Sequence, residues 1–167
     1  MSRCKRDVMP ETYLVWKFLH ITGVVMLMGN ITVTAIWKYF ADRDGRGPVL
    51  QFAQKLITYT DWSMTVWGVV LTMVGGYGLA IQGQFDRVSG WLLWAQLCFV
   101  AAGLIWMGLI VPIQIKSARM ARQFGDGPVP DAYKALSKRW IFWGLISTVP
   151  LVTALWLMIA QPAQAPM

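Results

Sequence analysis

Apolar residues run almost without interruption through four stretches of the chain, 13–39, 62–81, 91–115 and 140–160, and polar residues gather between them. Each stretch holds about 20 residues or more, the length that an α-helix needs to cross the roughly 30 Å hydrocarbon core of a bilayer. The apolar positions are continuous and do not alternate, which favours helices over the strands of a membrane barrel. The pattern therefore predicts an all-α membrane protein built as a four-helix transmembrane bundle.

Two turns rich in glycine and proline separate these stretches, one at 42–48 and one at 125–130. Glycine and proline interrupt helices, and proline also suits the first turn of the helix that follows. The polar segments beside the turns, 40–61 and 116–139, are expected to extend the spans as helices into the cytoplasm. The remaining connection, 82–90, is short. We expect two helical hairpins of the same orientation, forming a single transmembrane domain over 1–167.

Composition agrees with this class, and the charge distribution predicts an orientation. Hydrophobic residues make up 56% of the 167 residues and charged residues only 14%, whereas soluble domains carry about 25% charged residues. Most of the 15 Lys and Arg residues flank the two polar turns: Lys38, Arg43, Arg46, Lys55, Lys116, Arg119, Arg122, Lys134, Lys138 and Arg139. By the positive-inside rule these turns are cytoplasmic and both termini are periplasmic, although Arg3, Lys5 and Arg6 favour the opposite orientation. The net charge of +7 thus indicates a bacterial inner-membrane protein whose partner is the lipid bilayer, and no nucleic acid.

One histidine, His20, lies within the first apolar stretch and is the main candidate for chemistry. A neutral imidazole in a dry bundle can ligate heme iron, and Gly23 on the same side of the helix would leave room for a porphyrin edge. The sixth position could be filled by Met73, Met158, water or a second subunit. The alternative is a packing histidine, hydrogen bonded across the bundle to Gln96.

Two further features of the spans have structural explanations beside functional ones. Gly68, Thr72, Gly76 and Ala80 recur every four residues, a spacing that lets another backbone approach closely. This stripe can pack against a neighbouring helix, form a homodimer face or support a flat cofactor. Asp61 and Lys38 lie at the same predicted depth, near the cytoplasmic ends of their helices, and we expect an ion pair between them.

Several classes of site lack the residues that they need. A catalytic zinc ion usually has three protein ligands, whereas this chain has one histidine and two distant cysteines, Cys4 and Cys98. The sequence contains no Ser-His-Asp set, no nucleotide-binding loop and no carboxylate pair. Most of the ten methionines are interpreted as core residues, because Met26 and Met28 point to different sides of the first helix. No enzymatic reaction is assigned.

The first helix carries a motif. Trp16-Lys17-Phe18-Leu19-His20, followed by Gly23, Met28-Gly29 and Trp37-Lys38, resembles the opening helix of a superfamily of small membrane proteins. That superfamily includes the bacterial membrane protoporphyrinogen oxidase, the copper-resistance D membrane domain and several uncharacterised families of predicted integral membrane proteins. The Gly29-Asn30 step and the Trp37-Lys38 end are most similar to one of the uncharacterised families.

The resemblance implies a four-helix bundle with the Lys-x-x-His histidine near the outer face. In the porphyrinogen-oxidising relatives that histidine is implicated in heme binding, a role that transfers here to His20, with Lys17 as the lysine of the motif. This chain lacks the further histidines of the oxidases and the Met or His clusters of the copper proteins.

Three hypotheses follow. The first is a heme-binding or heme-handling redox component that holds heme b, with His20 as the iron ligand and Lys17, Gly23 and Gly76 around the cofactor. The second is a non-catalytic membrane subunit or assembly factor, acting as a homodimer or within a larger complex. The third is a component related to copper transport.

Overall fold

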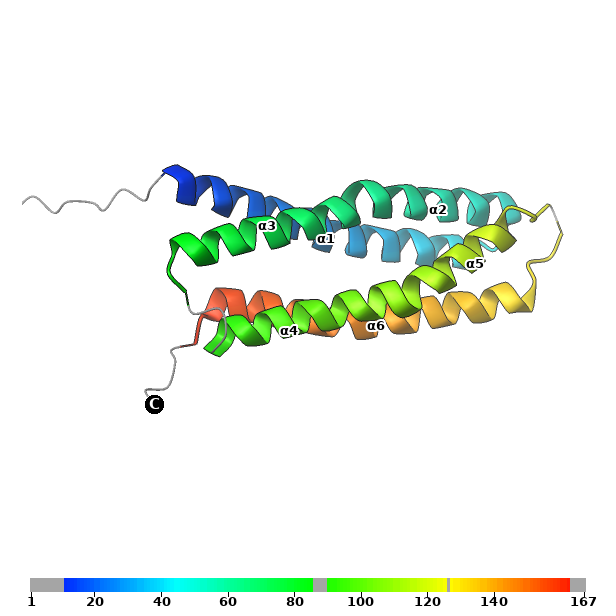
Figure 1. The fold of residues 1–167 in the computed structure, drawn as a ribbon. Helices are drawn as coiled ribbons and strands as arrows, with labels where there is room; N and C mark the ends of the chain where they lie inside the picture. The colour runs from blue at the N-terminus through cyan, green and yellow to red at the C-terminus, as the bar shows by residue number, and fades with distance from the viewer. Residues whose placement is uncertain (1–10, 86–89, 126, 163–167) are drawn as a thin grey trace, which may run out of the picture.

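The computed structural model describes residues 11–85, 90–125 and 127–162 (Figure 1). The elements in chain order are α1 (Glu11–Asp44), α2 (Gly47–Thr60), η1 (Asp61–Thr65), α3 (Val66–Gln82), α4 (Gly90–Ile105), η2 (Trp106–Ile110), α5 (Val111–Ala121) and α6 (Asp131–Ala160). Within the described ranges the chain is helical and has no strand. The segments η1 and η2 are single π-helical turns, and α2–η1–α3 and α4–η2–α5 each run as one long helix. We call these two long helices, together with α1 and α6, the four rods. The basic residues Arg3, Lys5 and Arg6 near the N-terminus, and Cys4 beside them, lie outside the described residues.

The four rods are each long and apolar enough to cross a membrane. Large apolar side chains such as Phe18, Leu104 and Leu145 point outward and are exposed. Such an outer surface suits lipid, because a helix in a bilayer satisfies its backbone hydrogen bonds internally and can present apolar side chains to the acyl chains. The predicted four-helix transmembrane bundle is confirmed, and the four expected spans fall within the rods.

The rods form two hairpins, with α1 packed along α2 and α3, and α4 and α5 packed along α6 (Figure 1). The first hairpin turns at Gly45, which has a positive φ of 73°, and Pro48 stands in the first turn of α2 as expected. The Glu11 end of α1 and the Ala160 end of α6 lie at the same end of the bundle (Figure 1). We call this the terminal end and the opposite end the loop end.

The backbones of α1 and α3 approach closely because small residues stand at their contact. A Cβ atom on Gly23 would lie 2.4 Å from the backbone nitrogen of Thr72, and one on Gly75 would lie 2.5 Å from that of His20. Gly68 faces Leu27 in the same way, at 3.0 Å. Gly68 and Thr72 of the predicted stripe therefore pack against a neighbouring helix of the same chain, which was one of the three interpretations of the stripe.

The hairpins meet at the loop end in an apolar cluster drawn from all four rods. It consists of Ala41, Leu50, Ala53, Ala121 and Tyr133. The Phe124 ring packs edge-on against Tyr133, with ring centroids 5.1 Å apart. Farther from the loop end, residues from both hairpins line two cavities, which are described below.

Substituting Gly23 with alanine should weaken the α1–α3 contact. The added methyl group would meet the α3 backbone, which cannot rotate away, and overpacking of this kind costs about 1–3 kcal/mol. Thermal unfolding of the detergent-solubilised protein would measure the change.

Gly29→Ala is the matched control, because a Cβ atom there meets nothing within 4 Å. It should leave stability unchanged or raise it by up to about 1 kcal/mol through helix propensity. Equal effects of the two substitutions would contradict the assigned contact.

Candidate functional site

A cavity of about 180 Å³ lies between the two hairpins, and His20 forms part of its wall. We call it the His20 cavity. Residues of α1, α3, α4 and α6 contribute to it, and most are apolar; they include Met73, Gly76, Phe99, Leu155 and Met158. Gln96 adds a polar group from α4. The cavity therefore combines one imidazole and the thioethers of three methionines, Met28, Met73 and Met158, with an apolar wall.

The orientation of the His20 ring is set by a hydrogen bond to the backbone of α3. Its Nδ1 atom lies 2.8 Å from the carbonyl oxygen of Thr72. A carbonyl can only accept, so Nδ1 carries a proton, and in the neutral ring Nε2 has the lone pair. Gly76 makes room for the ring, because a Cβ atom there would lie 3.0 Å from Nδ1. The hydrogen bond thus selects, for the neutral imidazole, the tautomer with the proton on Nδ1 and the lone pair on Nε2.

The other predicted site residues take different positions. Gly23 is buried against the backbone of Thr72 and is not part of the cavity wall. The space that was expected for a porphyrin edge at this glycine is filled by α3. Lys17, one turn before His20, is exposed. Gln96, the expected partner of the packing histidine, accepts a hydrogen bond from the Tyr77 hydroxyl and donates to the Leu92 carbonyl, while His20 is bonded to α3 instead.

A second cavity, of about 390 Å³, lies nearer the loop end and has Asp61 in its wall. We call it the Asp61 cavity. It adjoins the His20 cavity, because both are lined by Leu27, Met73, Phe99, Val100 and Leu151. An apolar space between the hairpins therefore extends from the imidazole at one end to a carboxylate at the other.

Asp61 is held by three hydrogen-bond donors from three helical segments. Asn30 Nδ2 on α1 and Thr65 Oγ on η1 donate to Oδ1, at 2.8 and 3.0 Å. Gln114 Nε2 on α5 donates to Oδ2 at 2.7 Å, and Gln114 itself accepts from the indole nitrogen of Trp140 on α6 at 3.1 Å. This network links all four rods.

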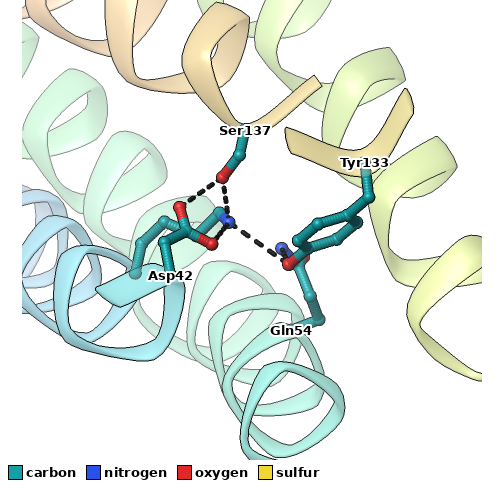
Figure 2. A network of polar contacts seen from close by, with 5 residues as sticks. Asp42, Gln54, Tyr133 and Ser137 are labelled. Atoms are coloured by element: carbon teal, nitrogen blue, oxygen red, sulfur yellow. Dashed lines mark hydrogen bonds and ion pairs between the residues drawn. The ribbon is translucent and has the colours of Figure 1, made fainter. Parts of the chain in front are cut away.

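A third polar cluster, at the loop end, surrounds Lys38. Its ammonium group donates to Asp42, to the Ser137 hydroxyl and to the Tyr133 hydroxyl, the last at 3.2 Å. Ser137 donates to Asp42 in turn, and Gln54 donates to Tyr133 at 3.1 Å. Figure 2 shows Asp42, Gln54, Tyr133 and Ser137 converging from the two hairpins. The Lys38 side chain is only 1% exposed, so the cluster compensates a charge that water does not reach.

The expected ion pair between Lys38 and Asp61 is wrong. Lys38 pairs with Asp42, which lies one turn farther along α1, and Asp61 is bonded to neutral amide and hydroxyl groups. The sequence placed both residues at a similar depth, near the loop end. It did not show toward which neighbouring helix each side chain points. The four-residue spacing of Lys38 and Asp42 is the sequence signal that identifies the real pair.

The chain is therefore a polytopic helical membrane protein whose buried polar groups face the space between its hairpins. A family model described as predicted integral membrane protein (DUF2269) matches residues 14–162. The chain belongs to this family, and the expectation of an uncharacterised membrane family is confirmed. No curated protein matches the chain, and neither does any solved structure.

Replacing Lys38 with methionine should destabilise the protein strongly. Methionine is similar in length but cannot neutralise Asp42, and removing one partner of a buried ion pair costs about 3–5 kcal/mol. Chemical denaturation in detergent, followed by tryptophan fluorescence, would measure the loss.

Lys134→Met is the control. Lys134 pairs with Asp131 at 2.9 Å on the surface, where ion pairs contribute little, so no measurable change is expected. Similar destabilisation by both variants would show that the Lys38 cluster has no special part in joining the hairpins.

Proposed function

We propose that this protein is a heme-binding or heme-handling redox component of the bacterial inner membrane, with His20 as an axial ligand of heme b. The observation that supports this best is the hydrogen bond from Nδ1 to the Thr72 carbonyl. Histidines that bind metals usually donate their other ring N–H to a carbonyl or carboxylate, which fixes the ring and raises its basicity. His20 has this arrangement beside an apolar cavity.

The residues around the cavity suit such a group. In the neutral ring of His20 the lone pair is on Nε2, and Gly76 leaves space for the ring beside α3. Met73 and Met158 line the same cavity, and either thioether could take the second axial position. Lys17 is the cation nearest along α1 for an acidic substituent of the porphyrin, while Gly23 packs on α3 and takes no part.

The size of the cavity sets a condition on the proposal. Ligand pockets usually measure about 300–1,000 Å³, so the 180 Å³ of the His20 cavity is too small by itself. The adjoining Asp61 cavity adds apolar space along the same line between the hairpins. A planar ligand would use both spaces or separate the hairpins slightly. When bound, heme would supply one-electron chemistry, and the chain's own residues would hold it, orient it and exclude water.

Copper handling is the second candidate, and one observation favours it. The imidazole of His20 and the thioethers of Met28, Met73 and Met158 line one cavity, and ligands of these kinds suit Cu(I). The remaining hypothesis, a non-catalytic subunit or assembly factor, predicts neither heme nor copper in the purified protein.

His20→Ala should abolish any heme signal while the protein still inserts into the membrane. The measurement is an absorption spectrum of protein purified in mild detergent, before and after dithionite reduction, with metal analysis of the same sample. The wild-type protein should show a Soret peak with reduced α and β bands.

Gln96→Ala is the control, because it changes the cavity wall without removing the imidazole. It should keep the heme spectrum. Heme content that survives in His20→Ala would refute the ligand assignment, and copper without heme in the wild-type protein would favour the second candidate.

We further propose that the loop end is cytoplasmic and both termini are periplasmic, from the excess of Lys and Arg beside the two turns. In a variant with Cys4 and Cys98 replaced by alanine, a cysteine at Gly127 should resist membrane-impermeant maleimide in intact cells. A cysteine at Gln82, which is exposed near the terminal end, should react. The reverse pattern would overturn the orientation.

A further inference from the structure

The Asp61 carboxylate has hydrogen-bond donors but no positively charged partner within the part of the chain that the structure describes. Among the described residues, the ion pairs join Lys38 to Asp42, Arg46 to Asp44 and Lys134 to Asp131, and none reaches Asp61. All three of its contacts use the carboxylate as an acceptor, so they stabilise the charged form. An ionisable side chain at membrane depth is costly and usually marks a site, so the missing opposite charge needs an explanation.

The donors are more deeply buried than the carboxylate that they hold. Asn30 is 2% exposed, Thr65 3% and Gln114 7%, whereas Asp61 is partly accessible and forms part of the cavity wall. The three donors therefore hold the carboxylate from the protein interior, while the carboxylate itself forms part of the cavity wall. Two oxygen atoms offer about four acceptor positions, and three are used, which leaves one for a bound molecule.

The rest of the wall indicates what kind of molecule fits. The Asp61 cavity has aromatic rings from three of the rods, Tyr39, Phe99, Trp106 and Trp140, among mainly aliphatic neighbours. Aromatic faces attract organic cations, most strongly where water is excluded. A hard metal ion fits less well, because it needs several oxygen ligands and here amide N–H groups surround the carboxylate.

We propose that the Asp61 cavity binds a lipid-soluble organic cation, with Asp61 as the counter-charge and the aromatic side chains around its apolar body. The Asp61 cavity adjoins the His20 cavity and shares part of its wall, but the proposal does not depend on heme. The volume of about 390 Å³ lies in the range of small-molecule pockets.

The test uses the full-length protein in lipid nanodiscs with tetraphenylphosphonium as the cation and triphenylphosphine oxide as an uncharged molecule of similar shape. Equilibrium dialysis gives both affinities. Asp61→Asn should weaken binding of the cation on the order of tenfold or more, because an opposite charge in a low-dielectric site is lost. Binding of the uncharged molecule should change little. Asp61→Glu should retain most of the affinity for the cation.

Asp44→Asn is the charge-matched control, because Asp44 lies on the surface beside Arg46 and is not part of the cavity wall. It should bind the cation as the wild-type protein does. Equal affinity of Asp61→Asn and the wild-type protein for the cation would overturn the proposal, since the carboxylate would then hold a proton or serve packing alone.

A second variant keeps the proposal testable if Asp61→Asn fails to fold. Gly103 lines the same cavity, and a Cβ atom there meets nothing within 4 Å, so Gly103→Leu should fold and partly fill the space. It should weaken binding of both the cation and the uncharged molecule while Asp61 stays intact. Unchanged binding in this variant would show that the ligand lies elsewhere.

Discussion

The contact between the backbones of α1 and α3 is the constraint on which both cavities depend. Glycines at positions 23, 68 and 75 let the two helices approach to distances that no side chain would allow. At this distance the ring of His20 reaches the Thr72 carbonyl, and the Asn30 amide reaches Asp61. Wider separation would leave both polar groups without these partners in an apolar environment, where an unmade hydrogen bond is expensive. The glycines that allow the close packing of the helices are therefore also needed for the hydrogen bonds of His20 and Asp61.

The contact between the hairpins has a different character along its length. At the loop end, the Lys38 cluster and the apolar cluster around Tyr133 join all four rods. Towards the terminal end the hairpins enclose the two cavities, and the Tyr77 hydroxyl on α3 donates across the hairpins to Gln96 on α4 at 3.2 Å. The hydrogen bond from Ser147 to the Ala102 carbonyl lies within the second hairpin. The Asp61 network lies between these regions. Binding space is thus placed where the hairpins are least tightly joined.

The sequence predicted the number of helices, their spans and the two hairpins, because continuous hydrophobicity and glycine-proline turns are local signals. It also identified His20, the single histidine, and the small-residue stripe at Gly68 and Thr72. It could not give the neighbours of these residues. Gly23 was assigned to the correct face of its helix, but the neighbour on that face is α3. Gln114 meets Asp61 across the hairpins, a contact that no local pattern encodes.

The π-helical turns explain part of the difference between the predicted and the observed surroundings of Asp61. A π turn accommodates one residue more than an α turn. The turn η1 contains Asp61 and Thr65 of the network, and η2 precedes Gln114 in the chain. The faces of α2 and α3 therefore do not follow a single period of 3.6 residues. Any estimate of which side Asp61 occupies, made from a regular helix, would be rotated from its observed position.

The Lys38 cluster and the apolar cluster around Tyr133 hold the two hairpins together at the loop end, so this contact is the natural pivot for any rotation of one hairpin against the other. Lys38 and His20 lie on the same helix, 18 residues apart, which corresponds to about 27 Å of helix. A rotation of only about 5° about the joint would displace the helices near His20 by roughly 2 Å. A small change of packing around Tyr133 thus produces a larger displacement at the imidazole. Conversely, a planar or bulky ligand that binds near His20 would change the packing at the loop end, at the opposite face of the membrane.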